Sequence, residues 1–169
     1  ELDRVAAASI VSAGLGLETL DDIAAWIEAE AKAGRRAILV DPVSAAVRKG
    51  QPWVADPAFV RRVKRAAIDY ECSVVLVSHL VKGADEGTPD KVAGSAAYGR
   101  FSDCVLQIMR HDKKTGTVKT PVGKMEIEHG QTIYIEKARA PGTGLRLAYD
   151  LTSGLTFQEF GVIVGGKQK

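Results

Sequence analysis

Four side chains suited to catalysis or phosphate binding stand at the ends of predicted strands. Asp41 follows the apolar run AILV, and Pro42 then ends the strand because it cannot donate a ladder hydrogen bond. His79 follows a second apolar run, SVVLVS, and Lys137 and Arg139 lie two positions apart in IEKARA. A carboxylate can hold the water shell of Mg²⁺, and a Lys/Arg pair suits a phosphate. These residue types indicate nucleotide chemistry.

Each of these residues also has a structural interpretation. Asp41 could cap or turn the chain, because Asp is favoured in turns. A single His such as His79 could be a hydrogen-bonded structural residue, and Lys137 with Arg139 could form a charged edge that discourages aggregation. The position of Asp41 and His79 at the ends of neighbouring strands favours a site, since open α/β sheets bind ligands at the carboxyl ends of their strands.

The elements that position these residues alternate between helix and strand. Residues 19–34 predict an amphipathic helix with Thr19 as N-cap, Gly34 as the stop and one apolar face, made of Leu20, Ile23, Ala24, Ile27 and Ala31. A strand at 36–41 follows, then a helix at 56–70 and a strand at 73–80. The second helix has Pro57 at its first position and an inward face of Phe59, Val60, Val63, Ala67 and Tyr70 or Ile68, with its basic residues solvated. This order predicts a parallel sheet covered by helices on both faces.

The second half of the chain has a different pattern. Residues 81–94 predict a polar, glycine-rich loop, 95–103 a short helix and 104–111 a strand. Residues 113–130 predict a turn-rich basic segment, after which alternating strands at 131–139, 144–151 and 154–160 are separated by turns. We therefore expect an antiparallel extension of the parallel sheet.

Length and composition limit the function classes. The 169 residues, 46% of them hydrophobic, suit a single domain with a sizeable core. A net charge of +2 identifies no class of partner, and Cys72 and Cys104 form neither a zinc motif nor a disulfide framework. No apolar run approaches the roughly 20 residues of a membrane span, so we expect a cytoplasmic protein without a membrane partner. The first residues resemble the end of a helix, which predicts a piece of a longer chain.

The order of these motifs resembles the C-terminal two-thirds of a RecA-like P-loop NTPase core, most closely DnaB-type and plasmid RepA-like hexameric replicative helicases. AILVDPVSA resembles the Walker B strand, and VVLVSHLVKG resembles the strand that ends in a γ-phosphate sensor. GSAAYGRFSDCVLQIMR resembles the segment leading from a DNA-facing loop, and IEKARAPGTGLRLAYDLTSGLTFQE resembles the terminal basic pair and strands. The resemblance covers residues 15–160 and implies one partial RecA-like ATPase domain over residues 1–169.

The resemblance also implies roles for individual residues. Asp41 would orient the Mg²⁺ water shell, and His79 would report loss of the γ-phosphate. Arg139 would be an arginine finger acting on ATP of the neighbouring subunit, with Lys137 beside it. The nucleic-acid contacts would be made by Lys82, Lys91 and Arg100. The implied cofactors are ATP and Mg²⁺, and the implied partners are single-stranded DNA and further copies in a hexameric ring.

The sequence departs from the family pattern in two places. It contains no GxxxxGK[ST] phosphate loop, which together with the catalytic Glu would lie upstream of Glu1, and it has PG at Pro141 and Gly142 where GP is frequent. We therefore expect negligible ATPase activity from these 169 residues alone. Two alternatives remain: a RadA-like or KaiC-like ATPase of recombination or regulation, and a RecA-fold scaffold that cannot use nucleotide.

Overall fold

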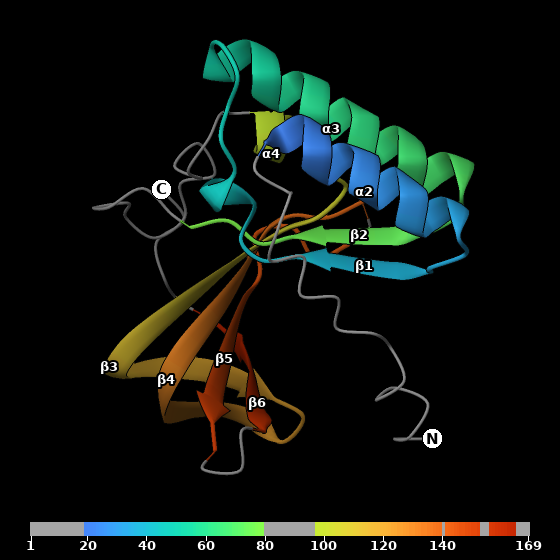
Figure 1. Cartoon of the computed structure of the whole chain (residues 1–169). Coiled ribbons are helices and arrows are strands. Elements are labelled where there is room, and N and C mark those ends of the chain that lie inside the picture. The colour runs from blue at the N-terminus through green and yellow to red at the C-terminus, as the bar shows by residue number, and fades with distance from the viewer. Residues whose placement is uncertain (1–18, 80–96, 140, 153–155, 165–169) are drawn as a thin grey trace. The chain divides into compact units, whose positions relative to one another are not determined.

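The computed structural model describes residues 19–79, 97–139, 141–152 and 156–164, which belong to two compact units (Figure 1). The first unit contains described residues 19–79 and 97–101. The second contains those from 102 onward. The predicted loop at 81–94, with the predicted nucleic-acid residues Lys82 and Lys91, lies outside the described part of the chain.

Helix α2, Leu20–Lys32, forms as the sequence predicts. Thr19 accepts a hydrogen bond from the Asp22 amide while Asp22 accepts one from the Thr19 amide, which completes a capping box. Gly34 has φ +89°, the left-handed conformation that ends a helix and that glycine adopts without strain. The buried residues are those of the predicted face, Leu20, Ile23, Ala24, Ile27 and Ala31.

Helix α3, Pro52–Asp69, begins five residues before Pro57, the predicted first position. Pro52 takes the first turn, where a missing N–H is tolerated, and Pro57 lies inside the helix. The inward face is also corrected at its end, because Ala66 is buried whereas Ile68 is 62% exposed and Tyr70 is 38% exposed. Ile68 lies about 200° of helical rotation beyond the buried Ala66 and so faces away from the core, and Tyr70 is the C-cap residue after the last turn.

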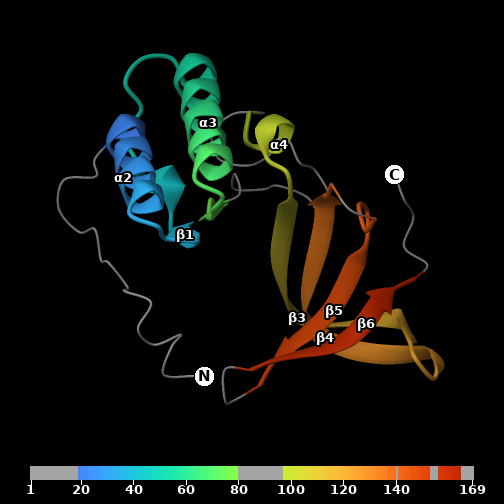
Figure 2. The same cartoon turned by 90° about the vertical axis from the view of Figure 1, so that its right-hand side faces the viewer.

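Two strands form the parallel sheet, β1 at Ala37–Val40 and β2 at Ser73–Leu76. They pair in register, Ala37 with Ser73 and Val40 with Leu76. Both helices lie on one face of this pair, as Figures 1 and 2 show. On the other face, Leu39 is 61% exposed and Val75 is 55% exposed. The prediction of helices on both faces is therefore wrong for the described residues.

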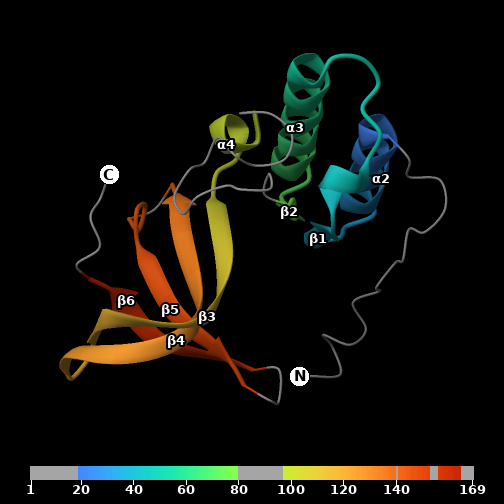
Figure 3. The same cartoon turned by 90° about the vertical axis from the view of Figure 1, so that its left-hand side faces the viewer.

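A short 3-10 helix and a short α-helix complete the first unit. The 3-10 helix η1, Val43–Ala45, follows β1, and the predicted short helix is α4, Ala97–Phe101. Helix α4 lies beside α3 in Figures 1 and 3. The tilted rings of Phe59 and Tyr98 join these two helices with centroids 6.5 Å apart.

The second unit is a closed antiparallel sheet in the order β3-β4-β5-β6 (Figure 3). Its strands are Val105–Thr120, Gly123–Lys137, Arg146–Leu151 and Phe157–Ile163. The antiparallel prediction is confirmed, but these strands form a sheet of their own and do not extend β1-β2. The segment predicted to be turn-rich is a long β3-β4 hairpin, interrupted by a register shift between Arg110 and Lys114.

The interior of the closed sheet is small and partly polar. Val118, Ala148, His129 and Thr132 are each at most 1% exposed. The Thr132 hydroxyl lies 3.0 Å from Nε2 of His111 and 3.1 Å from Nε2 of His129. A core built from such residues lacks a strong apolar alternation, which explains why the sequence pattern of this hairpin resembles that of a loop.

Candidate nucleotide site

The carboxyl edge of the β1-β2 pair is held together by one residue. Val77 donates its amide to the Val40 carbonyl and accepts a hydrogen bond from the Val43 amide, both at 2.8 Å. These bonds bracket Asp41 and Pro42 and extend the parallel pairing past the ends of both strands. Because the strands run in register, Asp41 and His79 lie at the same edge of the sheet.

Asp41 and His79 are both exposed at this edge. Among the described residues, no group of three or more His, Cys, Asp or Glu side chains could hold a metal ion. Mg²⁺ does not need such a group, because it keeps several waters and commonly takes one or two carboxylates together with substrate phosphates. A single accessible carboxylate at a strand end therefore fits a hydrated Mg²⁺ carried by a nucleotide.

Lys137 and Arg139 lie in the second unit, at the end of β4. Arg139 Nη2 lies 2.8 Å from Oδ1 of Asp103, and the two side chains are 71% and 49% exposed. The sequence analysis assigned no role to Asp103. The pair keeps the guanidinium near the start of β3 while leaving most of it accessible to solvent.

Glu136 is a second residue that sequence analysis did not single out. Val105 pairs with Lys137 and Leu106 with Ile135, so Glu136 is the extra residue of a β-bulge. Burial raises the pKa of the Glu136 carboxyl, and its Oε1 has no hydrogen-bond partner among the described residues. The one feature of the sequence that could have drawn attention to Glu136 is its position directly before Lys137. A bulge bends its strand and increases the local twist, here directly before Lys137.

The turn that follows the basic pair is well braced. The Thr143 hydroxyl accepts a hydrogen bond from the Ala138 amide at 3.0 Å and lies 3.3 Å from the Ala138 carbonyl. The Gly144 amide donates to the Ile135 carbonyl at 2.7 Å. Gly144 has φ +84°, a conformation that glycine reaches at little cost. The PGTG segment thus forms the predicted turn and fixes the backbone next to Arg139.

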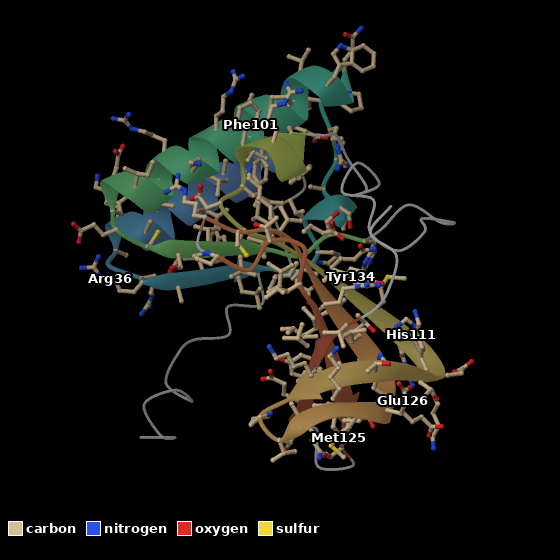
Figure 4. All side chains as sticks on the ribbon, turned by 180° about the vertical axis from the view of Figure 1, so that it is seen from behind. Arg36, Phe101, His111, Met125, Glu126 and Tyr134 are labelled. Carbon is tan, nitrogen blue, oxygen red and sulfur yellow. The ribbon has the colours of Figure 1, made fainter. Side chains whose placement is uncertain are left out.

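Of the three predicted nucleic-acid residues, Arg100 alone lies in the described part of the chain. Its helix, α4, is tied to α3 through Phe101, which lies against that helix in Figure 4. Lys64 Nζ donates to the Phe101 carbonyl at 3.1 Å, and the Arg61 guanidinium lies 4.8 Å from the centre of the Phe101 ring. Two of the basic residues of α3, Arg61 and Lys64, therefore contact α4, whereas Arg65 is exposed as predicted and pairs with Asp69 of its own helix.

A buried polar cluster formed by Arg48, Asp56 and Tyr98 joins the loop after η1 to α3 and α4. Arg48 Nε lies 2.9 Å from Oδ1 of Asp56, which is fully buried. Burial opposes the charge of Arg48, but the hydrogen bond and charge of Asp56 outweigh it and raise the pKa of Arg48. Burial, assisted by the charge of Asp56, raises the pKa of Tyr98 to about 12. Sequence analysis missed this cluster, because Asp56 was expected at the start of a helix.

A groove of about 300 Å³ lies between the first turns of α2 and α3. Its lining includes Asp21, Lys49 and Gln51 but neither Asp41 nor His79. The Asp22 amide is bound by Thr19 and the Leu20 amide by the Val47 carbonyl, and the carboxylates of Asp21 and Asp22 repel anions. These features disfavour a phosphate in the groove.

Compared with known proteins, the chain matches no family model and no curated sequence. Among the described residues, no helix has both the length and the apolar character that crossing a bilayer requires.

Proposed function

We propose that the chain supplies the Walker B, sensor and arginine-finger parts of an ATP-dependent motor on nucleic acid, of the type found in ring-forming replicative helicases. The observation that supports this most directly is the in-register parallel pairing of β1 and β2, which puts Asp41 and His79 at one edge. The likeness of the motif order to that family supports the remaining roles. ATP and Mg²⁺ are the proposed cofactors, and single-stranded DNA and like subunits are the proposed partners.

In this proposal Asp41 accepts hydrogen bonds from water bound to Mg²⁺, while His79 contacts the γ-phosphate region. Bound Mg²⁺ would neutralise charge on the phosphates. The bonds of Val77 keep the backbone around Asp41 fixed relative to the strand that leads to His79. A change at the phosphate would therefore reach both side chains through one short stretch of sheet.

Arg139 acts in trans on a neighbouring subunit in this proposal. It must first leave Asp103, and an ion pair as exposed as this one contributes only about 0–1 kcal/mol. An arginine finger raises the rate of phosphoryl transfer by roughly 10³ to 10⁵. The cost of breaking the pair is therefore small beside the gain at the transition state.

The test measures ATP turnover by the complete natural gene product, with and without single-stranded DNA. We expect Arg139→Ala to abolish most turnover, and Asp103→Ala to leave it largely intact because that change frees the finger. Mixing Arg139→Ala subunits with Asp41→Asn subunits should restore some activity, since the interface that takes Asp41 from the first kind of subunit and Arg139 from the second is complete. Unchanged turnover of the Arg139→Ala protein would refute the finger assignment.

The scaffold alternative has one structural observation in its favour, the pairing of Arg139 with Asp103 within its own chain. If the complete gene product neither binds nor hydrolyses ATP, the scaffold is the better interpretation. DNA strand exchange without unwinding would instead support a recombination ATPase.

A further inference from the structure

The far half of the β3-β4 hairpin ends in a rigid, exposed turn. The Thr120 hydroxyl donates to the Gly123 carbonyl at 3.0 Å and accepts from the Val122 amide at 3.3 Å. Val122 is 87% exposed, the largest exposed fraction among the described large hydrophobic residues, and Pro121 beside it is exposed too. The turn therefore presents an apolar apex that its own fold does not cover.

Two lysines flank this apex. Lys119 and Lys124 are exposed and lie directly opposite one another in the ladder. Like charges in this position destabilise a hairpin. Neither lysine has an ion-pair partner among the described residues. We name Lys119, Pro121, Val122 and Lys124 the lysine tip.

The acidic residues Glu126 and Glu128 lie on the same face of the ladder, farther from the apex, and each already has a bonding partner. The Thr117 hydroxyl donates to Glu126, and Lys113 Nζ lies 2.9 Å from Oε1 of Glu128. Figure 4 shows Glu126 and Met125 in this far half of the hairpin. The tip itself therefore carries positive charge alone, and the nearest acidic side chain on this face of the ladder, Glu126, is bonded to Thr117.

Strand β6 braces the hairpin close to the tip. Val118 pairs with Ile163 and is fully buried, and Lys119 pairs with Val162. At Gly161, an added Cβ would lie 2.5 Å from the Lys119 carbonyl oxygen, so the strands approach closely there. The two lysines and the apolar apex are thus held in a fixed arrangement before any partner binds.

We propose that the lysine tip is a nucleic-acid contact, in which the two lysines lie on backbone phosphates and Pro121 and Val122 lie against bases. Phosphates relieve the repulsion between the lysines, and the exposed apolar surface of Pro121 and Val122 suits the faces of unpaired bases. The choice of nucleic acid over other polyanions rests on the proposed function. The contact itself does not depend on the ATP site.

The test uses the 169-residue chain and a fluorescein-labelled oligothymidylate, with Kd measured by anisotropy between about 0.05 and 0.2 M salt. Two lost phosphate contacts reduce the slope of log K against log salt by about 1.4 and weaken binding roughly 25-fold at 0.1 M. We expect this result for Lys119→Gln/Lys124→Gln. Val122→Ser should weaken binding without a change of slope.

The matched control is Lys32→Gln/Arg35→Gln, which removes the same charge from the last turn of α2 and from the residues just after it. It should keep the wild-type slope. Equal slopes for the tip variant and wild type would overturn the proposal, as would binding of the chain to phosphatidylserine vesicles but not to DNA. Loss of ATP turnover in the Arg139→Ala protein bears on the proposed function alone, since this assay contains no nucleotide.

Discussion

Removal of Arg48 should destabilise the first unit strongly. Arg48→Met leaves the Asp56 carboxylate fully buried without its partner, and Asp56 Oδ2 already has no hydrogen bond among the described residues. Breaking a buried ion pair from one side costs about 3–5 kcal/mol. The Arg48 side chain is 20% exposed, so some water reaches the site, and we expect a loss of about 3 kcal/mol in the free energy of unfolding.

Urea denaturation followed by tryptophan fluorescence measures this loss selectively. The chain has two tryptophans, Trp26 and Trp53, and both belong to the first unit. With a denaturant slope of about 1.5 kcal/mol per M, a loss of 3 kcal/mol lowers the urea midpoint by about 2 M. The slope itself should not change.

The matched control replaces both partners. Arg48→Met/Asp56→Leu removes the buried charge together with its counter-charge, and such replacements are commonly neutral or stabilising by about 1–4 kcal/mol. The double variant should therefore be more stable than Arg48→Met. The reasoning is refuted if Arg48→Met costs less than about 1 kcal/mol. It is also refuted if the loss of stability in the double variant equals the sum of the losses in Arg48→Met and in Asp56→Leu.

Three further predictions concern single residues. Glu136→Gln should stabilise the second unit at neutral pH. Burial raises the pKa of Glu136 above 4.5 in the folded state, so ionisation of its carboxyl lowers the stability of the wild type as pH rises. Melting followed by circular dichroism should show no difference between variant and wild type well below pH 4.5. Asp22→Asn should destabilise the first unit at neutral pH, since hydrogen bonds from Thr19 lower the pKa of Asp22; the difference should shrink as pH falls below 3.8. Gly161→Ala should lower the free energy of unfolding by roughly 1–3 kcal/mol or more in melting experiments, because the added Cβ would lie 2.5 Å from the Lys119 carbonyl oxygen. The control is Gly34→Ala, which also has a positive φ but whose added Cβ would meet nothing within 4 Å.

Local signals in the sequence predicted the parts of the fold that local physics decides. The N-cap at Thr19, the stop at Gly34 and the apolar spacing of α2 needed no knowledge of the rest of the chain. The shared edge of Asp41 and His79 followed from two apolar strands separated by one helix. By contrast, Pro57 was predicted as the first residue of a helix that begins at Pro52, and the burial of Asp56 against Arg48 belongs to tertiary structure.

The second unit was harder to predict because its strands bury small or polar side chains. His129 and Thr132 are almost as completely buried as Val118. Because these inward-facing residues are polar, the alternation of inward and outward side chains along the strand does not appear as an alternation of apolar and polar residues. The register shift near Arg110 further interrupts the pattern. The bulge at Glu136 and the ion pair of Arg139 with Asp103 arise from strand pairing, and no local spacing predicts them.

The two hydrogen bonds of Val77 have a consequence for amide exchange. Its own N–H and that of Val43 are bound on either side of Asp41, so separation of the strand ends breaks both bonds. Their amide protons should therefore exchange with solvent at matched rates, set by one opening event. A ligand held by Asp41 would slow both by the same factor, and this pair of amides would record occupancy of the edge without any measurement of turnover.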